Sequence, residues 1–530
     1  MASRSTAVSV LAASALVLTA CSGDGSDGGG GAATPVEDGT LVTAVAGDPG
    51  NLDPHMTVLA LTRYVGTYMY DQLILIDEEG ELRPWLAESW QEEPGSVTFT
   101  LREGITCSDG SPLTASDVAA NVDFVADPAN QSPLLGLWVQ PGVTTSADDA
   151  ARTVTVTAGS PDPFLLQGLA LLPIVCAAGM ADRDSLAHSG NGTGMFTLEE
   201  AVPGERYTFQ RRDDYAWGPD GASASDPGTP ATVIIRVVPD ESTAVNLFLS
   251  GEVDLLAVTG PDQDRITAPD VRRYDVRTLF SQLIFNQADG RPGADPAVRR
   301  ALVQAVDWDE VGAVMTGGKG QPPTGLGVLE PKVCPADTVT GTIPPHDPAA
   351  AATVLDDAGW VADGGVRSRD GEPLALTLVY SSEAGSQLAA GVELVSQRWQ
   401  ELGVEVELRP VTSVQANEVL FGTGAWDAVI LSLNVAFPSQ LTGFFGGPPP
   451  PDGTNFGAIA NERYTSLTAA AMQQPGAAGC GDWAEAERAL IGAADVTPIV
   501  DSLLPYFADG VELRLNAGSP APPTLRLFTR

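Results

Sequence analysis

Lysine and histidine are scarce in this chain of 530 residues, which contains two lysines, Lys319 and Lys332, and three histidines. The charge balance is strongly acidic, with 68 acidic against 28 basic residues and a formal net charge of −40 at pH 7. Nucleic acids and anionic lipid headgroups are bound through clusters of lysine and arginine, so this composition argues against both as partners. We interpret the acidic excess as a solvated surface; attraction of a cationic ligand is the alternative.

Short motifs for the common enzyme chemistries are missing as well. The sequence contains no H-E-x-x-H, G-x-S-x-G or P-loop motif, and no serine stands three residues before either lysine. The stretch GNGTG at 190–194 lacks the full G-x-G-x-x-G pattern, and we read it as a turn. Carboxylates are so numerous that the sequence singles out no acid–base pair. We therefore predict a protein that is not an enzyme and has neither cofactor nor metal site. The alternatives are a secreted hydrolase with a carboxylate pair, or a surface sensory or interaction protein.

Apolar runs long enough to span a membrane are absent. A shorter apolar run, residues 7–17, lies near the N-terminus and follows Arg4. This run is too short to span a bilayer, which needs about 20 apolar residues. It leads into Leu-Thr-Ala-Cys, which resembles a bacterial lipoprotein lipobox and implies lipidation at Cys21, with residues 1–21 as the signal segment; an ordinary secretory signal is the alternative. Residues 22–39 are rich in Gly, Ser and Asp, which is typical of a flexible tether.

Four cysteines remain beyond Cys21, and an even number in an exported protein suggests two disulfides. Three pairings are possible, and we favour Cys107–Cys176 and Cys334–Cys480 because each pair falls within one region of the chain. Their spacing fits no zinc pattern. Cys107, within LREGITCSDGSPLTASDVAANV, could instead be a nucleophile with a distant histidine. Its place at a strand-to-turn junction, with a plausible partner, favours a structural role.

The length suggests two to four domains, and the hydrophobic pattern predicts an α/β protein. Residues 374–433 carry the clearest pattern, a β-α-β unit extended by a further strand, which is typical of an open sheet covered by helices. Thr114 with Asp117 makes an acidic form of the capping box before a helix. Asp-Pro pairs open two further predicted helices, 295–311 and 347–359. Other strands are predicted at 41–47, 96–105, 152–158, 231–240 and 253–258.

Several landmarks occur in a characteristic order along the chain: NLDPHM, YDQLILIDEEGELRPWLAESW, TFTLREGITCSDGSPLTASDV, GNGTGMFTLEE and NQADGRPGADPAVRRALVQAVDWDEV. Over roughly residues 41–515, this ordered set resembles the peptide/nickel class of extracellular solute-binding proteins of ABC importers. The resemblance implies a two-lobed periplasmic-binding-protein-like fold of type II, with an extra inserted α/β domain.

The resemblance also implies domain boundaries. One lobe would comprise residues 40–80, 190–287 and 490–530, the inserted domain residues 81–189, and the second lobe residues 288–489. Ligand would be trapped between the lobes as they close about a hinge.

The function implied by the resemblance is that of a receptor. It would trap a peptide-like or other small organic solute and deliver it to the permease of an ABC transporter. With the lipobox, this places the protein at the outer face of the bacterial cytoplasmic membrane. We expect a monomer.

Ligand positions carry over from the family in part. Asp48 matches a loop position that faces the ligand in peptide binders, Trp138 falls where an aromatic contact is common, and Asn286 lies at the crossover between lobes. Each also has an alternative, as a turn residue, a core residue and a hinge hydrogen-bonding residue respectively.

One loop departs from the family pattern. The candidate contacts there are Leu433, Asn434, Ala436 and Phe437. Peptide-binding members carry Trp at the first of these positions and, at the third, Asp, which pairs with the free α-amino group of the peptide. Because no acid occurs between Asp427 and Asp452, we expect this anchor to be missing. The ligand would then be a blocked or unusual peptide, a sugar or another organic solute. Nickel is not supported, since no histidine cluster is visible.

Overall fold

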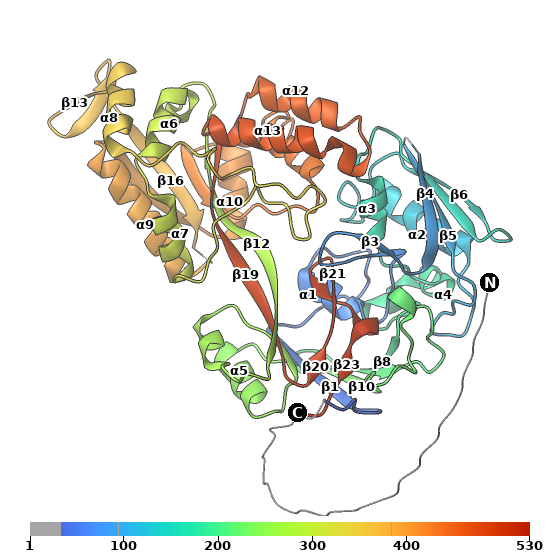
Figure 1. The fold of residues 1–530 in the computed structure, drawn as a ribbon. Helices are drawn as coiled ribbons and strands as arrows, with labels where there is room; N and C mark the ends of the chain where they lie inside the picture. The colour runs from blue at the N-terminus through green and yellow to red at the C-terminus, as the bar shows by residue number, and fades with distance from the viewer. Residues whose placement is uncertain (1–32, 94, 383) are drawn as a thin grey trace, which may run out of the picture.

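The computed structural model describes residues 33–93, 95–382 and 384–530 (Figure 1). The predicted signal segment, the predicted lipidation site Cys21 and most of the predicted tether lie outside these described residues.

Ten strands form one continuous sheet, in the order β17-β16-β18-β12-β19-β11-β1-β10-β9-β8. Two long antiparallel strands lie at its centre, β12 (Arg272–Phe285) and β19 (Val496–Ala508). They run between two groups of elements that we call lobe I, at the bottom of Figure 1, and lobe II, at its upper left. The chain is therefore two-lobed, with one sheet passing through both lobes.

Lobe I is built on three parallel strands, β1 (Thr40–Val45), β10 (Thr232–Val237) and β11 (Leu255–Ala257). The helices α1 (Ala60–Gly66) and α5 (Glu241–Leu249) follow β1 and β10. The carboxyl ends of these three strands point toward lobe II, because β11 runs antiparallel to β19, and β19 runs from lobe II to lobe I. Antiparallel strands extend the sheet at its edge, β8 (Phe196–Val202) and β9 (Arg206–Arg211).

Lobe II contains the predicted β-α-β unit. The strands β16 (Ala375–Ser381) and β17 (Glu405–Val411) are parallel neighbours joined through α9 (Gly385–Glu401), and β18 (Ala428–Leu431) is parallel on the other side of β16. The apolar face of α9 covers the sheet, and its Trp399 is fully buried. This part of the sequence prediction is confirmed.

The stretch 295–311 differs from the single helix expected there. It forms two helices, α6 (Pro296–Gln304) and α7 (Trp308–Thr316). The carboxylate of Asp307 accepts hydrogen bonds from the N–H groups of Asp309 and Glu310 and so caps a new helix start. An internal aspartate within an apolar repeat is thus a second N-cap.

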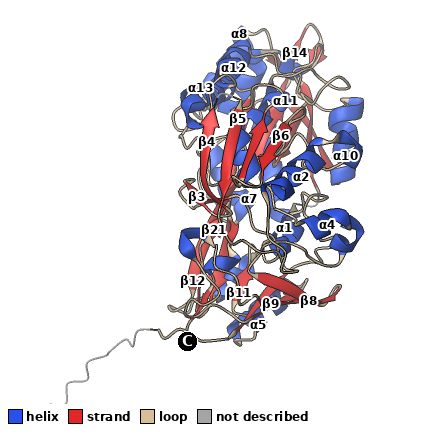
Figure 2. Cartoon of the chain, turned by 90° about the vertical axis from the view of Figure 1, so that its right-hand side faces the viewer, coloured by secondary structure: helices blue, strands red, loops and turns tan. Residues whose placement is uncertain are grey.

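The early part of the chain forms a separate antiparallel sheet, in the order β4-β5-β7-β6, seen in the foreground of Figure 2. Its strands are β4 (Ala87–Glu93), β5 (Ser96–Leu101), β7 (Thr153–Thr157) and β6 (Thr144–Asp148). The helix α2 (Ala115–Ala126) packs on β6 and β7, and it begins with the predicted capping box. Alternation of apolar residues and the cap signal are both local, which is why the sequence predicts them.

Both favoured disulfides are present. Cys107 bonds Cys176 beside the four-stranded sheet, and Cys334 bonds Cys480 at the start of α13 (Cys480–Gly492). Since Cys107 is buried and oxidised, it is not the nucleophile of an enzyme.

The GNGTG stretch packs the chain closely rather than forming a phosphate loop. A Cβ added at Gly192 would lie 2.4 Å from the Met69 carbonyl oxygen, and one at Gly194 would lie 2.4 Å from the Met69 carbonyl carbon. The N–H of Gly194 donates to that same carbonyl oxygen (3.0 Å). The glycines are therefore explained by backbone contact.

The remaining elements complete both lobes. The helices are α3 (Leu165–Ala170), α4 (Ala177–Ala181), α8 (Pro348–Asp357), α10 (Ser413–Asn417), α11 (Thr442–Phe445) and α12 (Glu462–Ala471). The short strands are β2 (Ile74–Ile76), β3 (Leu82–Pro84), β13 (Val361–Asp363), β14 (Val366–Arg369), β15 (Glu372–Pro373), β20 (Val511–Glu512), β21 (Leu515–Asn516), β22 (Ser519–Pro520) and β23 (Arg526–Leu527).

Candidate functional site

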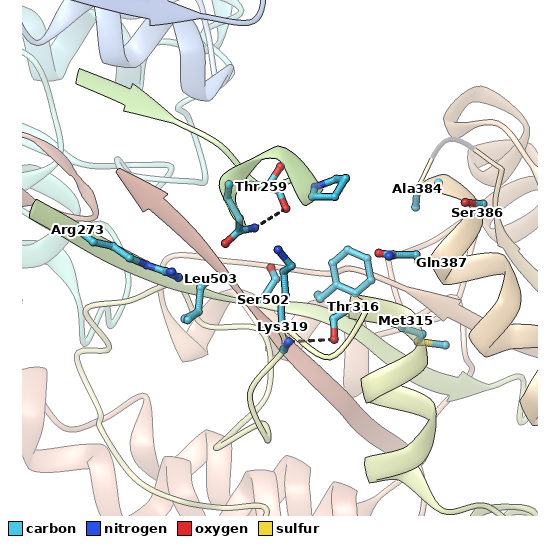
Figure 3. A pocket seen from close by; sticks show the side chains of 15 residues that line it. Thr259, Arg273, Met315, Thr316, Lys319, Ala384, Ser386, Gln387, Ser502 and Leu503 are labelled. Carbon is cyan, nitrogen blue, oxygen red and sulfur yellow. Dashed lines mark hydrogen bonds between the residues drawn. The ribbon is translucent and has the colours of Figure 1, made fainter. Parts of the chain in front are cut away.

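Two adjoining cavities lie between the lobes. The first, of about 520 Å³, is lined from lobe I by residues including Thr259 and Gln263 and from lobe II by residues including Thr316 and Lys319 (Figure 3). The second, of about 470 Å³, shares Phe280 with it. Cavities of this size are typical of small-molecule sites.

The second cavity lies beyond the carboxyl ends of the parallel strands of lobe II. Tyr380 of β16, Val411 of β17 and Leu431 of β18 all line it. The chain passes from β16 to β17 on one side and returns to β18 on the other, which makes this the switch point of the sheet. Open α/β sheets bind their ligands in the crevice at such a point.

An ion pair joins the two lobes beside the first cavity. Nζ of Lys319 lies 2.6 Å from Oδ1 of Asp264, in the 3₁₀ turn Pro261–Arg265 of lobe I. A turn after α7 positions the lysine, and a Cβ at Gly320 would lie 2.4 Å from Cγ2 of Val500. The side chain of Asp264 is 72% exposed, so this pair contributes little to stability.

The floor of both cavities is the central strand pair, where the register between β12 and β19 shifts. Leu279 pairs with Asp501 and Ser281 with Val500, so Phe280 bulges and lines both cavities.

The same face of the strand pair continues beyond Phe280 toward lobe I. The hydroxyls of Thr278 and Ser502 lie 3.1 Å apart on that face. Two residues along the strands, Val276 and Leu504 point the same way. They belong to the apolar cluster that also contains Trp138.

An exposed apolar segment precedes α1 at the carboxyl end of β1. Met56, Val58 and Leu59 are 37%, 49% and 65% exposed, in a molecule whose other large apolar side chains are mostly buried. A patch of this kind is typical of a ligand or partner surface. The sequence analysis did not select it, because an apolar run before a helix reads as core.

Two of the predicted contacts lie beside the second cavity. Nδ2 of Asn434 donates to the carbonyl oxygen of Leu279 (2.9 Å) and to Oγ of Ser432 (2.7 Å), and both of these residues line that cavity. Oδ1 of Asn434 is buried and has no hydrogen-bond partner among the described residues. The carbonyl oxygen of Leu433 lies against Gly327, where a Cβ would be 1.7 Å away.

Two others join lobe II to the four-stranded region. The ring of Phe437 is stacked on Phe164 with centroids 5.4 Å apart. Oε1 of Gln440 accepts from the N–H groups of Ala436 (2.8 Å) and Phe437 (3.1 Å), while its Nε2 donates to the carbonyl oxygen of Leu137 (2.7 Å). This loop therefore links lobe II to the four-stranded region outside the central strand pair.

Asp48 stands in an exposed turn of lobe I. Although burial acts to raise its pKa, hydrogen bonds from the N–H groups of Gly204 and Gly50 and from the hydroxyl of Tyr207 hold the pKa of Asp48 below its usual value. Its carboxylate already accepts three bonds within the protein. The turn alternative raised from the sequence describes this geometry.

Trp138 and Asn286 are both buried, each 3% exposed. Cζ of Arg63, on α1, lies 4.4 Å from the centroid of the Trp138 ring. Arg63 is a residue that the sequence analysis missed. Nδ2 of Asn286 donates to the carbonyl oxygen of Trp426 (2.9 Å), which ties the end of β12 to the start of β18.

The cleft offers surfaces for holding a solute. The described residues lining the two cavities are mostly apolar or hydroxyl-bearing, and their charged members are Arg273 and Lys319. Among the described residues, no group of three or more His, Cys, Asp or Glu is arranged to hold a metal ion. The arrangement suits binding by shape, apolar contact and hydrogen bonds.

Comparison with known proteins gives matches that cover most of the chain. The family model for bacterial extracellular solute-binding proteins, family 5 (middle), matches residues 81–453. Protein XP55 of Streptomyces lividans is 30% identical over 426 residues, covering 77% of this chain and 73% of that protein. The nickel-binding periplasmic protein of Escherichia coli (strain K12) is 27% identical over 398 residues, covering 71% of each.

Among solved structures, a substrate-binding protein from Microbacterium hydrocarbonoxydans, complexed with 4-hydroxybenzoate hydrazide, matches with a TM-score of 0.68 and 27% identity. The match covers 92% of this chain and 99% of that one. It therefore concerns the two-lobed arrangement as a whole rather than one segment.

Proposed function

Because the chain belongs to the bacterial extracellular solute-binding proteins of family 5, we propose that it captures a small organic solute between its two lobes and passes it to the permease of an ABC importer. The observation that carries the proposal is the pair of cavities at the carboxyl ends of parallel strands in both lobes. A ligand that touches both lobes there favours the closed state by its extra contacts. The relatives are binding proteins rather than enzymes.

The domain division that supports this mechanism is the one expected from the family. We propose that residues 40–80, 190–287 and 490–530 move as one lobe, with residues 81–189 attached to it, against residues 288–489. Neither disulfide then joins the two moving bodies. Cys107–Cys176 lies within one body and Cys334–Cys480 within the other. Closure about β12 and β19 would strain neither.

The solute differs among the relatives, so the ligand that a relative is named for does not identify the ligand of this chain. One relative is named for nickel and one structure holds 4-hydroxybenzoate hydrazide. We propose an organic solute, because the described cleft presents apolar and hydroxyl groups and no metal-holding cluster. Asn434 and Leu433 remain proposed contacts, since they flank the second cavity.

A thermal-shift screen of organic solutes tests the proposal. A true ligand raises the melting temperature by mass action, whereas simple dipeptides should stabilise weakly or not at all, because Ala436 stands where peptide binders carry their acidic anchor. Strong stabilisation by simple dipeptides would contradict this reading of the loop. Turnover of a bound solute, lost on changing one carboxylate, would contradict the receptor function.

We further propose that Cys21 is lipidated and holds the receptor at the outer face of the cytoplasmic membrane. Among the described helices none has the length and apolar character needed to cross a bilayer. Cys21→Ser should move the protein from the membrane fraction to the soluble fraction. Lipid labelling that persists in this variant would refute the anchor.

A further inference from the structure

Arg63, on α1, is a half-buried arginine without a counter-charge among the residues that the structure describes. Within that part of the chain, its guanidinium makes neither a hydrogen bond nor an ion pair, and its one ring contact is Trp138, 4.4 Å from Cζ. Burial lowers the pKa of Arg63 to about 10, which leaves it charged at neutral pH. In a chain with 68 acidic residues against 28 basic ones, an unpaired, largely desolvated cation needs an explanation.

The position of Arg63 is the place where three parts of the molecule meet. Trp138 belongs to the region of the four-stranded sheet, and its neighbour Leu137 accepts the hydrogen bond from Gln440 of lobe II. Trp138, Phe437 and the side chain of Ala436 belong to one apolar cluster. Arg63 therefore lies near the contact between lobe II and the four-stranded region, outside the lining of the two cavities.

The surface beside Arg63 is apolar. Met56, Val58 and Leu59 lie four to seven residues before it in the chain, in the irregular segment before α1, and are the most exposed group of large apolar side chains in lobe I. An apolar surface beside an unpaired cation matches a ligand with an apolar body and an anionic end.

The loop of lobe II at this contact offers no acid that would hold a cationic group. The loop from Asp427 to Asp452 contains no carboxylate between those two residues. Among the described residues lining the two cavities there is none either. A solute carrying a free amino group would lose its hydration there without gaining a counter-charge.

We propose that Arg63 binds the anionic group of the solute, and that this solute is an amphipathic organic acid whose apolar body lies against the exposed segment 56–59. This inference rests on the proposed receptor function and names the class of solute. A carboxylate can meet a guanidinium through two parallel hydrogen bonds, which gives orientation as well as affinity. The stacking on Trp138 holds the guanidinium in place before the ligand arrives.

Three probes with one apolar body and different ends test the inference: 4-phenylbutyrate, 4-phenylbutanamide and 4-phenylbutylamine. Titration calorimetry with the purified full-length protein should show the carboxylate binding at least about tenfold more tightly than the amide, with the amine weakest. Equal affinities for carboxylate and amide overturn the inference, as does failure of the carboxylate to bind at about 1 mM.

Variants then assign the preference to a residue. Arg63→Gln should remove the preference for the carboxylate and leave the amide affinity unchanged, whereas Arg63→Lys should keep part of it. Arg300→Gln is the matched control, because that arginine is exposed on α6 and lines neither cavity. Lys319→Gln tests the lysine of the first cavity as the alternative binder of the anion. Loss of the preference in Lys319→Gln, with Arg63→Gln like the wild type, overturns the assignment.

A melting curve of each variant separates loss of binding from loss of folding. The failure of this inference also differs from a failure of the receptor function. Binding of a neutral or cationic solute with closure of the lobes would overturn the inference alone, and turnover of the solute would overturn the receptor function.

Discussion

His55, in the loop before α1, is fully buried against the chain segment that returns from the four-stranded region. Its Nε2–H donates to the carbonyl oxygen of Pro173 (2.9 Å), and Arg183 approaches Nδ1 (3.4 Å). Burial, assisted by the charge of Arg183, lowers the pKa of His55 to about 3. The imidazole is thus neutral in the folded protein at every pH above that value.

This burial predicts a pH dependence of stability. In the unfolded chain the histidine takes up a proton below pH of about 6.5, whereas the folded state does so near its lowered pKa, so stability is lost as pH falls between these values. The stabilisation that the wild type has over His55→Gln should therefore shrink by about 2 kcal/mol from pH 7 to pH 5. Urea unfolding at both values measures it, with the exposed His188→Gln as control; a difference that does not change with pH contradicts the assignment.

Single residues show where sequence reasoning reached its limit. The capping box of Thr114 and Asp117 was predictable because its spacing is local and its partners are backbone groups of the same turn. Arg63 was not, because its importance lies in a missing counter-charge, which depends on every segment folded around it. Asp48 was selected by its place in the chain, and its hydrogen bonds to Gly204 and Tyr207 are long-range.

At the scale of elements, the second disulfide holds the long segment between α7 and α8. Cys334 is 146 residues from Cys480, and the bond fastens that segment to the start of α13. Replacing both cysteines by alanine should lower the free energy of unfolding by about 2–5 kcal/mol. Denaturant unfolding measures this loss, and the Cys107/Cys176 double replacement provides the comparison. A stability equal to that of the wild type would show that the bond does not constrain the unfolded chain.

The elements that the sequence predicts well are those with a strong local period. Residues 374–433 were predicted because α9 carries a continuous apolar stripe between two apolar strands. The central strands β12 and β19 were not singled out, since their alternation is broken at the bulge near Phe280 and their burial changes as they pass from one lobe to the other. The strands that pass between the lobes therefore lack a regular alternation in sequence.

At the scale of the whole molecule, the two lobes touch at both ends of the cleft. One contact is the ion pair of Lys319 with Asp264, and the other is the stack of Phe437 on Phe164 with the hydrogen bond from Gln440 to Leu137. Both connect lobe II to the rest of the chain without passing through β12 and β19. We expect each contact to break when the lobes separate.

The aromatic stack should contribute to ligand affinity although it lies on the protein alone. The rings of Phe437 and Phe164 are nearly parallel, at 18°, and such a pair is worth about 0.5–1.5 kcal/mol beyond its buried area. Phe437→Ala should therefore destabilise the closed state and weaken ligand binding by about two- to tenfold, because the ligand must then supply that free energy. Calorimetry measures the affinity, and small-angle scattering should show a larger radius of gyration without ligand.

Phe164→Ala completes a double-mutant cycle for this contact. If the two rings act through each other, the double variant should bind no more weakly than either single variant, since the contact is already lost. Phe421→Ala is a suitable control, because that ring meets Phe456 edge-to-face within lobe II and, among the described residues, makes no ring contact between lobes. Losses that add in the double variant would show that each phenylalanine acts separately, and that the closed state does not depend on their contact.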